Sequence, residues 1–146
     1  MAETSDKTIR VELITPEGCL FADEARMVVV PGAAGEVGVL PRHMPLTARL
    51  KPGETRIQRG GPEDWLSFAT SEGFFTVGAD LAVVLVEHAE EASAINVSAV
   101  QSELEAARGR LSEAEAAGGE ERSADVEMAM RDVLYAESKL KVAGKD

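Results

Sequence analysis

Cysteine and histidine are scarce in this sequence of 146 residues. Cys19 is the single cysteine, and the two histidines, His43 and His88, lie in separate segments. One cysteine excludes an intramolecular disulfide and a cysteine-rich zinc site, and no His-x-x-x-His or Cys-x-x-Cys spacing occurs. No serine lies in a Gly-x-Ser-x-Gly motif. We therefore expect no metal site and no catalytic residues.

Aromatic residues and long apolar runs are also few. Phe, Trp and Tyr together make up 4% of the chain, so the core must consist mainly of aliphatic side chains. No stretch approaches the roughly 20 apolar residues that a membrane-spanning helix needs. The first six residues are polar and acidic, unlike the basic and then apolar start of a signal peptide. We expect no targeting segment and no direct insertion into lipid.

Basic residues are outnumbered by acidic ones. Lys and Arg number 15, Asp and Glu number 26, and the net charge is -11. A chain this acidic is repelled by nucleic acids and by anionic lipid headgroups, because both are bound through basic surfaces. Proteins are therefore the expected partners. Residues 42–59 form one locally basic stretch, in which Glu54 is the single acidic residue. Its basic residues are Arg42, Arg49, Lys51, Arg56 and Arg59.

Residues 1–92 have the pattern of short β-strands. Apolar and polar residues alternate in 9–13 and again in 65–69, which is typical of strands with one buried face. The uninterrupted apolar run 81–86 is expected to lie inside the sheet structure. Turn signals separate these runs at 16–18, 52–53 and 60–62. The spacing predicts an all-β sandwich or flattened barrel as the first domain.

Residues 93–146 have a helical pattern. Ser98 and Gln101 are spaced as a capping box, Gly118 and Gly119 mark the end of a first helix, and Ser123 is the expected cap of a second. We predict an antiparallel α-helical hairpin. Its apolar stripe is rich in alanine and valine, so a permanently packed hairpin and a detachable one are both compatible with the sequence. The stripe consists of Val100, Leu104, Ala107, Leu111 and Ala114, then Val126, Ala129, Val133, Ala136, Leu140 and Ala143.

One glycine-rich segment, residues 31–46, invites comparison with a phosphate-binding loop. Such a loop must lead into a helix, whereas prolines follow here and no lysine stands where the phosphates would need one. The segment instead predicts a turn-rich hairpin with glycines at positive φ. Its polar residues Glu36, Arg42 and His43 would lie on a constrained loop, which suits recognition of a partner.

A resemblance to the epsilon subunit of F-type ATP synthases is carried by the segment Gly35-Glu36-Val37-Gly38-Val39-Leu40-Pro41-Arg42-His43. The opening strand and turn, residues 12–18, and the stretch 50–53 are similar to the same family. The order of β-domain and hairpin matches over almost the whole chain. The resemblance implies a flattened β-sandwich followed by two antiparallel helices. It also implies a non-catalytic subunit of the rotary central stalk.

The resemblance further implies partners and residues that bind them. In that family the β-domain joins the foot of the gamma subunit to the membrane-embedded c-ring. Glu36 corresponds to a loop acid near the c-ring, and His43 to a histidine near the same interface. The family commonly has glycine before that histidine, where this sequence has Arg42. We expect partner binding by Glu36, Gly38, Arg42 and His43, and a peripheral location at the cytoplasmic face of a bacterial inner membrane.

The family's hairpin can extend into the catalytic alpha/beta hexamer and inhibit ATP hydrolysis, and in some members it binds ATP. The ATP-binding pattern has an aspartate and an arginine at the positions that Asn96 and Ala99 occupy here. We therefore expect neither ATP nor another cofactor to bind. Inhibition would use basic residues of the second helix, where this sequence has Arg122, Arg131, Lys139 and Lys141.

Two other functions are compatible with these patterns. A stand-alone acidic adaptor could bind a partner helix through the apolar stripe of its hairpin. A small enzyme could have its site between the two domains, although no nucleophile–base pair or metal-binding set is present. The favoured interpretation is a stalk subunit that couples rotation of the gamma subunit to a proton- or sodium-translocating c-ring.

Overall fold

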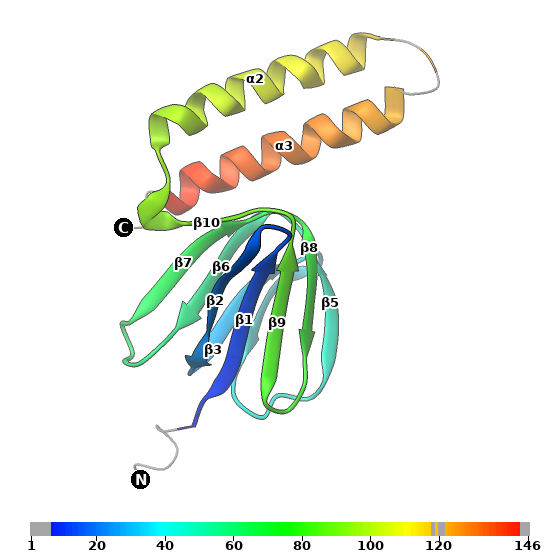
Figure 1. Cartoon of the computed structure of the whole chain (residues 1–146). Helices are drawn as coiled ribbons and strands as arrows, with labels where there is room; N and C mark the ends of the chain where they lie inside the picture. The colour runs from blue at the N-terminus through cyan, green and yellow to red at the C-terminus, as the bar shows by residue number, and fades with distance from the viewer. Residues whose placement is uncertain (1–6, 118, 120–121, 144–146) are drawn as a thin grey trace.

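The computed structural model describes residues 7–117, 119 and 122–143. Its strands form one ten-stranded sheet that curls into a flattened, nearly closed barrel, with two helices beyond one end (Figure 1). This arrangement confirms the predicted fold class. The strands are β1 (Ile9–Thr15), β2 (Gly18–Ala25), β3 (Met27–Gly32), β4 (Gly35–Val39), β5 (Leu46–Leu50), β6 (Gly53–Gln58), β7 (Trp65–Thr70), β8 (Gly73–Val77), β9 (Leu81–Val86) and β10 (Ala89–Glu91).

The curled sheet has two halves that meet at a single residue pair. One half contains β10, β7, β6 and β3, and the other contains β5, β8, β9, β1 and β2 in that order. The halves are joined where Gly32 of β3 pairs with Leu50 of β5. Strand β4 pairs with the other edge of β3. All pairs are antiparallel except the parallel pair of β1 and β9.

Both halves of the sheet bury side chains in one common core. In β1 the residues Ile9, Val11 and Leu13 are fully buried, and the polar residues between them are not, as the alternation predicted. Phe68 and Phe75 come from opposite halves and are the largest of the fully buried side chains. Phe68 and Phe75 therefore lie in a core whose other buried side chains are aliphatic.

Strand β9 shows why its sequence is uninterrupted and apolar. It lies between β8 and β1, inside the sheet as predicted. Its even-numbered residues face the core, whereas Leu81, Val83 and Leu85 alternate with them and lie on the outer face. Leu81 and Leu85 are exposed. The apolar run therefore contributes to two faces of the sheet, and the described residues of this chain bury only the inner one.

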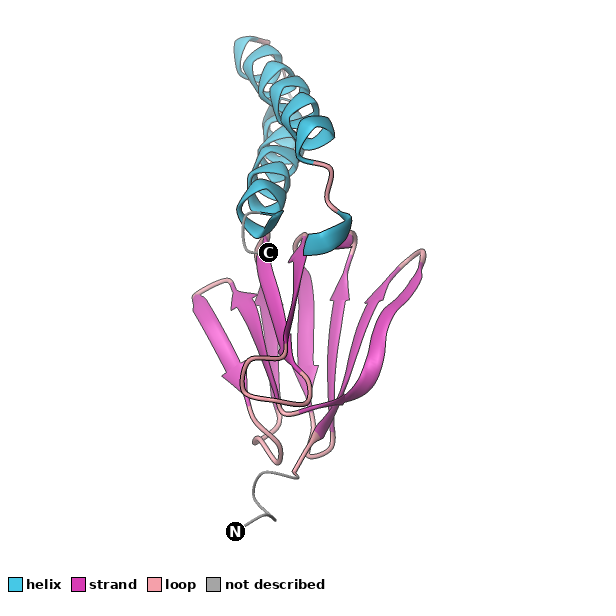
Figure 2. Ribbon diagram, turned by 90° about the vertical axis from the view of Figure 1, so that its left-hand side faces the viewer, coloured by secondary structure: helices cyan, strands magenta, loops and turns pink. Residues whose placement is uncertain are grey.

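The second domain is a hairpin of α2 (Val97–Ala116) and α3 (Arg122–Ala143), preceded by a single 3₁₀ turn, η1 (Ala92–Ala94). The two halves of the predicted apolar stripe pack against each other in a cluster centred on Val100, Leu104 and Val133. Figure 2 shows the hairpin beyond one end of the strands. Within the described residues, neither helix is both long and apolar enough to cross a membrane.

The predicted helix caps differ from those in the structure. Helix α2 begins two residues earlier than expected, because the side chain of Asn96 accepts a hydrogen bond of 3.0 Å from the backbone N–H of Ala99. Asn caps a helix as well as Ser does, so the prediction of Ser98 as the cap was wrong. Ser123 lies inside α3 rather than before it. Of the two predicted helix-ending glycines, Gly118 lies outside the described residues.

Candidate partner-binding sites

The four predicted partner-binding residues lie in one short segment, residues 35–45, which comprises β4 and the loop before β5. We call this segment the docking loop. Glu36 is exposed, with Arg56 3.5 Å from its carboxylate. The imidazole Nδ1 of His43 lies 2.7 Å from the carbonyl oxygen of Met44, a contact that fixes the ring against the loop backbone. The neighbouring Met44 side chain is 79% exposed.

Two positions of the docking loop constrain its backbone. Arg42 has φ 65°, and it is the one non-glycine residue with positive φ in the described chain. A left-handed backbone suits glycine, the residue that the resemblance leads us to expect before the histidine. The loop thus keeps the glycine conformation and adds an exposed cation. At Gly38, an added Cβ would lie 2.9 Å from the terminal methyl of Met27, so glycine permits this close packing.

The predicted basic patch is partly neutralised. Arg56 contacts Glu36 at 3.5 Å and Glu54 at 3.9 Å. Arg59 donates to Asp64 at 2.7 Å, and this bond, with a second from a backbone N–H, lowers the pKa of the Asp64 carboxyl. Two of the five cations, Arg56 and Arg59, are therefore paired with nearby acids.

A second candidate surface is the outer face of β8 and β9. Phe74 and Leu85 are directly opposite each other in the strand register and are 55% and 45% exposed. They line an open groove of about 520 Å³ that extends to Ile14 of β1. We call Ile14, Phe74, Leu81, Val83 and Leu85 the outer apolar face. Contiguous exposed apolar residues of this kind mark interaction sites.

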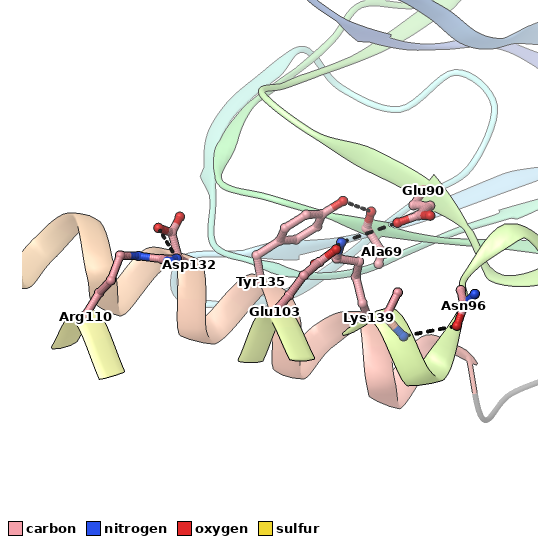
Figure 3. Close-up of polar contacts among 9 residues, drawn as sticks. Ala69, Glu90, Asn96, Glu103, Arg110, Asp132, Tyr135 and Lys139 are labelled. Atoms are coloured by element: carbon pink, nitrogen blue, oxygen red, sulfur yellow. Dashed lines mark hydrogen bonds and ion pairs between the residues drawn. The ribbon is translucent and has the colours of Figure 1, made fainter. Parts of the chain in front are cut away.

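The junction of the hairpin with the β-domain contains two of the four predicted regulatory cations. Lys139 lies 2.8 Å from a carboxylate oxygen of Glu103 on α2 and 3.4 Å from one of Glu90 on β10 (Figure 3). Arg131 lies 3.1 Å from Glu72, in the turn between β7 and β8. Both cations are thus paired within the chain.

The other two predicted cations are placed differently. Lys141 is exposed and makes none of the ion pairs found among the described residues. Arg122 begins α3, but its side chain lies outside the described part of the chain. Of the three cations whose side chains are described, only Lys141 is therefore available to a partner without breaking an internal contact.

Tyr135 is the residue of the junction that the sequence analysis missed. Its hydroxyl donates to the carbonyl oxygen of Ala69 on β7 at 3.4 Å, and its ring stacks on His88. Burial raises the pKa of Tyr135, and the charges of Glu90 and Glu103 raise it further. The hydroxyl therefore remains a hydrogen-bond donor at physiological pH. Its single occurrence in the chain was the one signal available in the sequence.

Asn96 and Ala99, which occupy the positions of the ATP-binding pattern, form the N-terminal cap of α2. Two cations that line the cleft between the helices, Arg110 and Lys139, face Asp132 and Glu103 at 3.4 and 2.8 Å. Among the described residues, no group of three or more His, Cys, Asp or Glu side chains is arranged to hold a metal ion.

Comparison with known proteins agrees with this fold and layout. The family described as ATP synthase, Delta/Epsilon chain, beta-sandwich domain matches residues 8–92. The ATP synthase epsilon chain of Desulforamulus reducens is 42% identical over 105 residues, which cover 72% of this chain and 78% of that one. That of Halalkalibacterium halodurans is 36% identical over 138 residues, covering 94% and 98%.

Solved structures show a similar fold at low sequence identity. A chain in the Euglena gracilis mitochondrial ATP synthase, a structure of OSCP, F1 and the c-ring, has a TM-score of 0.71 at 19% identity. The match covers 90% of this chain and 78% of that one. A chain of the Tetrahymena thermophila central stalk and c-ring has a TM-score of 0.59 at 13% identity, with 89% and 96% covered. Taken with the sequence matches, the chain belongs to the ATP synthase epsilon chain family, the non-catalytic subunits of the central stalk.

Proposed function

We propose that this chain couples the gamma subunit to the c-ring of a proton- or sodium-translocating ATP synthase. The outer apolar face binds the gamma subunit, and the docking loop meets the c-ring. The observation that carries the proposal is the outer apolar face, because Phe74, Leu81 and Leu85 are exposed in the described part of the chain. The solved complexes with similar folds contain a c-ring and a central stalk, which supports these two partners.

The outer apolar face suits a permanent rather than a transient contact. Its side chains come from three adjacent strands, β1, β9 and β8, so the sheet holds them rigidly. Burying apolar surface contributes roughly 25 cal/mol per Å², and a rigid surface loses little entropy when it binds. Rotary coupling needs such a fixed attachment, because torque would otherwise be lost in local motion.

The docking loop suits the polar surface of a c-ring. Glu36 and Arg42 present one charge of each sign on a loop whose backbone is constrained. Opposed charges can fix orientation against a polar partner. Through these contacts the chain would lie at the cytoplasmic face of a bacterial inner membrane as a peripheral subunit.

The hairpin is proposed to inhibit ATP hydrolysis by leaving its docked position and entering the alpha/beta hexamer. Arg131, Lys139 and Lys141 would supply basic contacts there. In the docked form Arg131 is paired with Glu72 and Lys139 with Glu90, so release from the β-domain would remove both contacts, while Lys139 keeps Glu103 of α2. We infer that the switch works without bound ATP, because Asn96 and Ala99 form a cap and Arg110 faces Asp132. Isothermal titration with ATP should accordingly give no binding heat.

Reconstitution tests these proposals together. The purified chain is added to an epsilon-depleted ATP synthase from the same source, and binding, ATP hydrolysis and ATP-driven ion transport are measured. We expect stable binding, restored ion transport and slowed hydrolysis. Deleting residues 95–146 should leave binding intact and raise hydrolysis. Binding with unchanged hydrolysis would contradict the inhibitory role, and failure to bind would contradict the coupling role.

A point substitution separates the outer apolar face from other exposed apolar residues. Leu85→Ser should weaken binding to the gamma subunit at least tenfold, since it places a hydroxyl in a buried interface. Met128→Ser is the matched control, because Met128 is also exposed and apolar but lies on α3. Equal weakening by both variants would show that the outer apolar face has no special role.

The alternative function, a stand-alone adaptor, would need the apolar stripe of the hairpin as its binding surface. The apolar stripe of the hairpin packs between α2 and α3 and is not open to a partner helix. A stand-alone adaptor would have to separate the two helices before binding, at the cost of their mutual burial. The stalk function needs no such rearrangement for its contacts with the gamma subunit and the c-ring.

A further inference from the structure

We propose that Lys139 acts as a latch that fastens α3 to α2 and the hairpin to the β-domain with one ammonium group. The inference deepens the proposed regulatory role of the hairpin and rests on it. The Nζ atom lies 2.8 Å from Glu103 of α2 and 3.4 Å from Glu90 of β10. Three elements that are separate in the sequence therefore meet at a single cation, as Figure 3 shows.

The surroundings of Lys139 make this contact stronger than a surface ion pair. Its side chain is 10% exposed, although lysine side chains are rarely buried. The ammonium also lies 5.0 Å from the centre of the Tyr135 ring, within range of a cation–π contact. A charge removed from water needs such partners, and undocking would take Glu90 away from Lys139. Lys139 therefore favours the docked arrangement, where both carboxylates and the ring are present.

Tyr135 extends the latch to a fourth element. Its hydroxyl donates to Ala69 of β7, and Ala69 also packs with Val142 in a small apolar cluster under the hairpin. The same ring that lies against Lys139 thus touches the β-domain directly. Undocking the hairpin would remove Glu90 from Lys139 and Ala69 from Tyr135 in one step, so the two contacts are released together.

The ion pair between Arg131 and Glu72 can be compared with the contacts of Lys139, because it also joins the hairpin to the β-domain. Arg131 and Glu72 also connect α3 with the β-domain at 3.1 Å, but their side chains are 45% and 42% exposed. Exposed pairs are screened by water and salt and contribute little. The latch is therefore assigned to the buried cation and not to cations of α3 in general.

The position of the hairpin can be measured in the full chain. Spin labels are attached to the native Cys19 on β2 and to Ser112→Cys on α2, both exposed, and their distance distribution is recorded. The parent chain should give one main population. Lys139→Met, which keeps the length of the side chain, should raise the undocked population about tenfold, equivalent to about 1.4 kcal/mol.

Two further variants decide the assignment. Arg131→Met is the matched control and should change the undocked population less than twofold, because its ion pair is exposed. Glu90→Gln keeps the lysine and the helices and should raise the undocked population about fivefold, since a charged partner becomes neutral. It also decides the test if Lys139→Met fails to fold. An unchanged distribution in Glu90→Gln and Lys139→Met, or an equal change in Arg131→Met, overturns the latch.

Hydrolysis assays distinguish the latch from the inhibitory role. Glu90→Gln is the variant for this assay, because it leaves every basic residue of the hairpin in place. If it undocks the hairpin in the isolated chain and slows hydrolysis in the reconstituted enzyme, both proposals hold. If it undocks the hairpin and hydrolysis does not change, the latch holds and the inhibitory role fails. If the hairpin stays docked in the variant, the latch fails whatever the hydrolysis rate.

Discussion

The core of the β-domain and the contacts of the helical hairpin differ in the size of the side chains that they bury. The β-domain core contains Phe68, Phe75 and Leu13, all 1% exposed or less, together with many valines. The hairpin cluster consists of five buried residues of which two are alanines, Ala107 and Ala136. Both clusters exclude water, but a phenylalanine removes several times more apolar area from water than an alanine does.

This difference assigns different mechanical roles to the two domains. The β-domain has one continuous core and hydrogen-bonded strands, so it should unfold as a unit at high free energy. The hairpin depends on small side chains and on cross-helix ion pairs such as Arg108–Glu137, which is largely exposed and contributes little. A rigid docking body thus carries an element that can separate from it at modest cost.

The largest effect is expected in the β-domain core. Phe75→Ala should lower the free energy of unfolding by about 3–5 kcal/mol, because it leaves a cavity at the centre of the core. Phe74→Ala is the matched control, since Phe74 is next in sequence but 55% exposed. Chemical denaturation followed by Trp65 fluorescence measures both. A comparable loss in Phe74→Ala would show that the core is not where the stability lies.

A smaller and local effect is expected in the hairpin. Leu104→Ala should cost about 2–3 kcal/mol, in the lower part of the range for buried leucines, because its neighbours are small and can close part of the gap. The loss should appear in the helical circular dichroism signal at 222 nm and leave the Trp65 transition almost unchanged. Coincident shifts of the two signals would mean that the domains unfold as one unit.

The fold could be predicted largely from the sequence, because two periodicities dominate it. The alternation in β1 and the spacing of the helical stripe both report which face is buried, and the structure buries the apolar residues of β1 and most of the stripe. Strand β2 was missed because five of its first six residues are exposed, so it has no alternation to detect. The open outer face of β9 was also missed, since an uninterrupted apolar run fits a strand covered on both sides.

The junction could not be predicted from the sequence. Glu90, Glu103 and Lys139 lie on three elements, and their meeting depends on how the hairpin is placed on the sheet. No local pattern encodes that placement. Arg42 is a different case, because the resemblance named the position where glycine is common but could not show that an arginine would keep the left-handed backbone. Local sequence patterns therefore predict the strands and helices, whereas the contacts between them can be seen only in the structure.

The start of α2 offers a direct test of one such local rule. Asn96→Ala should destabilise the helix by about 1 kcal/mol, because it removes the bond accepted from the Ala99 N–H. Ser98→Ala should have almost no effect, since Ser98 already lies within the first turn. Thermal unfolding of the helical signal ranks the two variants. If Ser98→Ala were the more destabilising variant, Ser98 rather than Asn96 would be the N-cap of α2.

The smallest expected effect is a gain of stability in the same helix. Gly109 lies in the exposed interior of α2, and an added Cβ would meet no atom within 4 Å. Gly109→Ala should therefore stabilise the hairpin by about 0.5–1 kcal/mol, because alanine loses less backbone freedom on folding. The same substitution at Gly119, where φ is +112°, should lower the stability instead, since a side chain is strained there.

Thermal unfolding at 222 nm measures the stability of both variants. The distance distribution from Cys19 to residue 112 shows whether the more stable α2 also docks more often. If Gly109→Ala stabilises the helix and leaves docking unchanged, helix formation and docking are separate equilibria.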